Sequence, residues 1–150
     1  MQVSLAKIFI MEIILGNYSA GPFVIEEDRV KDIKDKSKVQ IGMSARLKYS
    51  SASDVCGIQF DFILNHNEEL VIKTGFLFGM EIKNLKEFIS DNNTREKNLK
   101  HVTEIIEFIW PFTVGAFAAR CGDHSFQMML PPIDASRFAS EVILSNQDKQ

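Results

Sequence analysis

The chain has 150 residues, of which 45% are apolar and 25% are charged, and its formal net charge at pH 7 is −3. This length and composition predict one folded domain over residues 1–150 and exclude a disordered chain. The acidic balance offers no basic surface for the phosphates of nucleic acid, so we expect no nucleic-acid partner. Two cysteines, Cys56 and Cys121, are too few for a disulfide scaffold or a closed zinc site, and they fit a reducing cytosol.

The first stretch, residues 3–15, is apolar at most positions. It carries Lys7 and Glu12 and lacks a basic start and a small-residue cleavage site, so a core strand is favoured over a signal peptide. Residues 17–21 have turn chemistry, and residues 22–38 read as a long, charged and mostly aperiodic connection. No stretch approaches the length of a membrane helix, so we expect a cytoplasmic protein without membrane insertion.

Three segments then alternate between apolar and polar residues, which is the pattern of half-buried strands. They cover residues 39–49, 56–64 and 70–78. The short links between them favour antiparallel pairing. Together with the first strand, they predict a four-stranded antiparallel sheet.

Helical spacing of apolar residues begins after residue 80, first at 85–89 and then over 103–120. Pro111 lies inside the longer pattern and predicts a kink or a new first turn. Gly122 suits a left-handed helix end. Four strands followed by helices predict an α+β fold in which the long helix packs on one face of the sheet.

The last part of the chain contains a strip rich in sulfur and aromatic side chains, residues 126–130, followed by Pro131 and Pro132. Because the residue before a proline is disfavoured in a helix, we expect this strip to be extended and to lie on the surface. Asp134 is suited to cap a short C-terminal helix.

Side chains that carry out catalysis are scattered along the sequence. Cys121 and His124 have the spacing of two metal ligands, but two are too few and no second pair accompanies them. Asp123 and His124 fit a polar turn, with no third group to orient a nucleophile and base. We therefore predict no metal, no cofactor and no enzymatic activity.

The sequence is rich in side chains that form apolar contacts, with 12 phenylalanines and 6 methionines. Many of these side chains must fill the core. Met128 and Met129 are flexible and polarizable, so they can repack against different partners. The strip at 126–130 either lines a groove for apolar peptide or packs on the sheet or at a subunit interface.

Two motifs resemble the C-terminal part of SecB-type export chaperones. They are I-W-P-F-T-V-G-A-F-A-A-R-C-G at 109–122 and Q-M-M-L-P-P-I-D-A-S-R-F at 127–138. The stretch Gly75-Phe76-Leu77-Phe78 resembles a G-x-F stretch of the same family. The likeness covers roughly residues 69 to 138.

The resemblance implies a cytosolic, ATP-independent holdase that binds unfolded polypeptides and delivers exported ones to the SecA translocase. It also implies a homotetramer built as a dimer of dimers. The family's groove lies beside the connection between the first two strands and the loop before the last helix. By this resemblance, the candidate peptide-binding residues are Phe23, Val24, Phe76, Phe78, Phe126, Met128, Met129 and Leu130.

Other functions stay open at this point. A SecB-like adaptor dedicated to one partner, such as an antitoxin, would have the same fold. So would a structural module whose methionine strip is buried at an interface, or a small-ligand or enzyme domain on the concave face of the sheet. The sequence also leaves open whether SecA is bound and whether assembly stops at a dimer.

Overall fold

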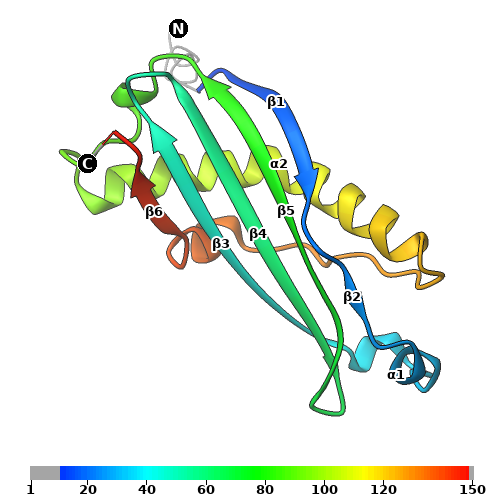
Figure 1. Cartoon of the computed structure of the whole chain (residues 1–150). Coiled ribbons are helices and arrows are strands. Elements are labelled where there is room, and N and C mark those ends of the chain that lie inside the picture. Colours follow the sequence, from blue (N-terminus) through cyan, green and yellow to red (C-terminus); the bar gives the residue numbers. More distant parts are fainter. Residues whose placement is uncertain (1–10, 149–150) are drawn as a thin grey trace, which may run out of the picture.

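The computed structural model describes residues 11–148. It consists of one six-stranded sheet with the long helix α2 across one face, which confirms the predicted α+β class (Figure 1). The strand order is β1-β5-β4-β3-β6, and the short β2 pairs with β5. The strands are β1 Ile13–Ala20, β2 Val24–Ile25, β3 Gln40–Ser50, β4 Val55–His66, β5 Glu69–Ile82 and β6 Ile143–Asn146.

The sheet has six strands, so the prediction of four antiparallel strands is wrong in number. β1, β3, β4 and β5 pair antiparallel, as expected. β6 runs parallel to β3 beside Arg46–Tyr49, and β2 pairs with two residues of β5. Neither added strand is long enough to show a clear alternation in the sequence.

The first strand also differs from its prediction. β1 covers Ile13–Ala20, so most of the expected turn at 17–21 is strand. Polar residues fit there because β1 lies at the edge of the sheet and most of its side chains are exposed. Residues 3–10 of the predicted strand lie outside the described part of the chain.

The core lies between α2 and the sheet face that it covers, here called the helix face; the opposite side is called the open face. Alternate residues of β4 and β5 point to the helix face, among them Phe60, Phe62 and Phe78, which are buried. On α2, Trp110 lies 5.9 Å from Phe60 and Phe117 lies 5.3 Å from Phe62, between ring centroids. Burial of each such side chain contributes about 1.5–3 kcal/mol.

Helix α2 spans Arg95–Gly122 without interruption, so Pro111 does not start a new helix. The side chain of Thr94 caps its first turn by accepting the N–H of Lys97 at 3.2 Å. The predicted left-handed helix end at Gly122 is wrong. The left-handed residue of this turn is Ser125, with φ of 60°.

Four shorter helical segments complete the described chain: α1 Glu27–Lys31, η2 Lys36–Lys38, η3 Leu85–Glu87 and α3 Ala135–Ala139. Arg29 fastens α1 to the start of β5 through an ion pair with Glu69 at 3.0 Å. The predicted cap of the C-terminal helix is confirmed, because Asp134 accepts the N–H of Arg137 at 3.2 Å. That hydrogen bond favours the charged carboxylate and holds the pKa of Asp134 below its ordinary value.

By length and composition, α2 could cross a membrane, so the prediction that no stretch approaches that length is wrong. The core helix of a soluble protein meets the same criterion. Here α2 buries Ile105, Ile109 and Phe117 against the sheet. On its other side Phe112 is 47% exposed, so part of the apolar surface of α2 remains uncovered.

Candidate functional site

Four of the eight candidate residues belong to the protein's own core. Phe76, Phe78, Phe126 and Leu130 are each at most 5% exposed. Phe76 and Phe78 point to the helix face, whereas Leu77 between them points to the open face and is exposed. The expectation that the whole 126–130 strip lies on the surface is therefore wrong for Phe126 and Leu130.

The other four candidates reach the surface to different extents. Met129 is 71% exposed and Val24 is 42% exposed. Phe23 and Met128 are partly buried and pack against the core. The exposure of the side chains thus alternates along residues 126–130: the first and last are buried, and Met129 is directed outward.

Met128 and Met129 line a groove of about 410 Å³ between the loop before α3 and the start of β3. Val39, Ile41 and Pro131 supply the rest of its apolar lining. We call these five residues the methionine groove. Lys36, Ser37 and Gln127 complete the lining with polar groups.

Lys36 links the two segments that form this groove, the start of β3 and the loop before α3. Its ammonium group donates to the backbone carbonyl of Gln127 at 2.5 Å and lies 5.0 Å from the ring centroid of Phe126. Asp35 caps η2 by accepting the hydroxyl of Ser37 at 2.6 Å and its N–H at 3.0 Å, and these bonds lower the pKa of Asp35. The methionines therefore project from a backbone that is tied to the connection before β3.

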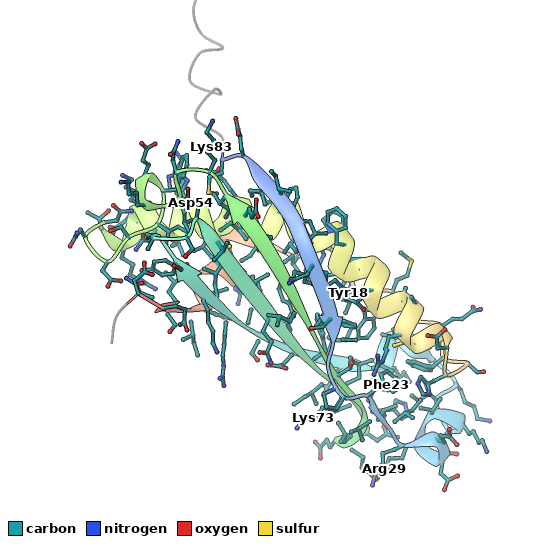
Figure 2. The ribbon with its side chains drawn as sticks, turned by 45° about the horizontal axis from the view of Figure 1, so that its top comes forward. Tyr18, Phe23, Arg29, Asp54, Lys73 and Lys83 are labelled. Atoms are coloured by element: carbon teal, nitrogen blue, oxygen red, sulfur yellow. The ribbon has the colours of Figure 1, made fainter. Side chains whose placement is uncertain are left out.

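Phe23 occupies a separate cluster at the end of α2. Its ring stacks on His124 with centroids 4.3 Å apart, and the guanidinium of Arg120 lies 5.4 Å from the ring centroid. Arg120 also donates to the carbonyl of Gly21 at 3.0 Å. Figure 2 shows Phe23 at the same end of the sheet as Arg29 and Lys73, with Asp54 and Lys83 at the opposite end. Phe23 does not line the methionine groove.

Val24 borders a hollow of about 430 Å³ on the open face of the sheet, which sequence reasoning missed. Gly75, Asp61, Lys73 and Leu77 are among the residues that line it. A Cβ atom on Gly75 would lie 2.8 Å from Oδ1 of Asp61. The only sequence signal was a glycine on the polar side of an alternating strand. The structure thus brings Met128 and Met129 together and places Phe23 and Val24 elsewhere.

Reactive groups are sparse in the described part of the chain. No group of three or more His, Cys, Asp or Glu side chains that could hold a metal occurs among residues 11–148. Burial raises the pKa of the Cys56 thiol to about 12 and that of Cys121 to about 11. Both thiols are therefore protonated at neutral pH and are weak nucleophiles.

No family model matches the sequence, and no curated protein matches it. In fold, the chain is similar to a SecB-like chaperone. That structure is from Mycobacterium tuberculosis, in complex with a ChAD peptide from the HigA1 antitoxin; the match covers 89% of this chain and 98% of the other, at 9% identity and a TM-score of 0.48. A protein of unknown function from Streptococcus agalactiae matches over 81% of this chain and 98% of its own, at 13% identity and a TM-score of 0.44.

Proposed function

We propose that this protein is an ATP-independent holdase chaperone that binds unfolded polypeptide segments in the methionine groove. The exposure of Met129 beside Met128, in a groove with apolar walls, carries this proposal. Large exposed apolar side chains mark interaction sites, and methionine adapts its shape to different apolar partners. The SecB-type motifs at 109–122 and 127–138 support the same function.

We propose a homotetramer, a dimer of dimers, in which the outer side of α2 packs against another copy. Phe108 and Phe112 lie on this side with their rings 5.7 Å apart, and Phe112 is exposed. Gly115 and Ala119 follow along the same side and would let a second helix approach closely. Several grooves on one particle would hold a client more strongly than one groove.

The proposal extends to location and partners. We place the protein in the cytoplasm, with unfolded chains or preproteins as clients and without a cofactor. Transfer of preproteins to SecA for export is its most specific part, and it rests only on the resemblance to the SecB family. Retention of the unfolded client would reduce the concentration that is free to aggregate.

A second candidate is a SecB-like adaptor dedicated to one partner, such as an antitoxin, without a general role in export. The size of the groove favours this candidate, because about 410 Å³ accommodates only a few side chains. Such an adaptor would bind one sequence strongly, whereas a holdase would bind many unfolded chains with similar affinity.

The experiment that tests the groove is the double substitution Met128→Asp and Met129→Asp. It should abolish the suppression of client aggregation while leaving assembly intact, because carboxylates in the groove oppose apolar binding. Ile63→Asp is the matched control: Ile63 is exposed on the open face, directly opposite Lys73, where a carboxylate is tolerated. Loss of assembly in the double variant, or equal loss of activity in the control, would count against the groove.

A further inference from the structure

The outer edge of β3, which faces away from β4, is only partly covered. β6 pairs with Arg46–Tyr49 on this edge. Beside residues 40–45 no strand lies on the same edge in the described part of the chain (Figure 1). About half of β3 therefore forms an edge of the sheet whose outer side pairs with no other strand among the described residues.

The backbone groups on this edge can be assigned from one hydrogen bond. The carbonyl of Tyr49 accepts the N–H of Gln147 at 2.8 Å, so the backbone groups of Tyr49 point away from β4. Successive residues of a strand point to opposite edges, and the pairing of β3 with β4 is regular along its length. The N–H and C=O groups of Ile41 and Met43 therefore point to the open edge.

This open edge adjoins the methionine groove. Ile41 and Met43 direct their side chains to the helix face, because their partners Leu64 and Phe62 are buried there. Ile41 lines the groove with Met128 and Met129. Unpaired backbone groups and an apolar groove thus form one continuous surface. Strand addition uses this combination: backbone hydrogen bonds provide affinity, and pockets for alternate side chains provide selectivity.

We propose that the open edge of β3 is a strand acceptor for an extended, apolar segment of a client polypeptide. This inference rests on the proposed function and adds the mode of binding to it. The client backbone pairs with Ile41 and Met43, and its alternate apolar side chains enter the methionine groove. The remaining side chains of the client face the open side, so their identity matters little.

The chain's own β6 shows that this edge accepts a strand. Ile143 is 61% exposed, so β6 pairs with β3 without burying a large apolar side chain there. Besides its backbone pairing with β3, β6 is held in place by two hydrogen bonds of the residue that follows it closely. The carboxylate of Asp148 accepts the hydroxyl of Ser50 at 2.7 Å and the N–H of Ala52 at 3.1 Å. β6 occupies the half of the edge that lies farther from the groove. It limits the length of β3 that a client can pair with.

The test compares two short peptides of alternating valine and threonine. One is unmodified, and the other carries N-methyl groups on the amides that would face β3. The unmodified peptide should bind and slow hydrogen exchange at the amides of Ile41 and Met43. Exchange at Gly42 and Ser44, whose amides face β4, should not change. The methylated peptide should bind at least about tenfold more weakly, because its side chains are unchanged but its backbone cannot pair.

Equal binding of the two peptides, or bound peptide without protection of Ile41 and Met43, would overturn strand addition. Either result would leave the holdase proposal intact, because that is decided separately by client aggregation. Failure of both peptides to bind would also overturn the inference.

A second test removes β6 by ending the chain after Val142. The backbone groups of Leu47 and Tyr49 then become available, and the unmodified peptide should bind several-fold more tightly. If the shortened chain does not fold, Asp148→Ala keeps β6 but loosens it, and a smaller gain in affinity is expected. Unchanged affinity in a folded variant would show that β6 and the client do not share this edge.

Discussion

At the scale of the residue, Gly75 and Gly79 show how the space beside a strand constrains a sequence. A Cβ atom on Gly75 would lie 3.0 Å from the carbonyl oxygen of Phe60, which is backbone and cannot move aside. On Gly79 it would overlap the side-chain amide of Asn17, which can rotate away at the exposed edge strand. Both glycines lie in the same strand and look alike in the sequence. Only the fold shows that backbone is in the way at Gly75 and a side chain at Gly79.

Gly75→Ala should therefore lower the free energy of unfolding by about 1–3 kcal/mol, the usual cost of overpacking. Gly79→Ala should lower it by less, because only a side chain has to move. Urea denaturation of both variants measures the difference. The reverse order of stabilities would show that the backbone beside Gly75 can move aside for a Cβ atom.

Residue identity predicted the N-terminal cap of α3 correctly, but it did not predict the end of α2 or the exposure of residues 126–130. Asp134 was predicted correctly because its hydrogen bond to the N–H of Arg137 is local. Phe126 and Met129 both appeared as surface residues of an extended strip, yet Phe126 is buried. Which side of an extended segment faces the core depends on what packs against it, here η2 with Lys36, which is remote in sequence.

At the scale of the element, β3, β4 and β5 were predictable because their alternation is long and regular. β2 and β6 were not, since a strand of two or four residues shows no clear period. Helix α2 continues through Pro111 because that residue is on the solvent side, where the freed carbonyl of the preceding turn can bind water. On the buried side, Thr113 donates to the carbonyl of Ile109 at 3.0 Å, so its hydroxyl is satisfied.

The attachment of β6 should weaken in acid. Hydrogen bonds from Ser50 and from the N–H of Ala52 stabilise the charged form of Asp148, which lowers its pKa below the ordinary 3.8. The stabilising effect of this carboxylate is complete above pH 3.8 and is lost as the pH falls through the lowered pKa.

Amide chemical shifts of Leu47 and Tyr49, followed by NMR from neutral pH into acid, measure this loosening. They should move in the wild-type protein as Asp148 is protonated. In Asp148→Ala the shifts should already be displaced at neutral pH and should not show that titration. A titration that persists in the variant would assign the effect to another group.

At the scale of the whole molecule, the apolar surfaces lie on different sides of the fold. The methionine groove lies at the start of β3, and the exposed part of α2 faces away from the sheet. This separation allows a particle to assemble through α2 while its grooves remain accessible to clients. The sequence motifs predicted both the helix and the strip, but only the fold shows that Met128 and Met129 share a groove with Val39 and Ile41.

The most direct measurement is the aggregation of a chemically unfolded client with and without this protein, together with light scattering for the mass of the particle. We predict suppression at near-stoichiometric amounts by a tetramer of about 68 kDa, four times the chain mass of 17.0 kDa. A folded protein that leaves client aggregation unchanged at all ratios would contradict the holdase function.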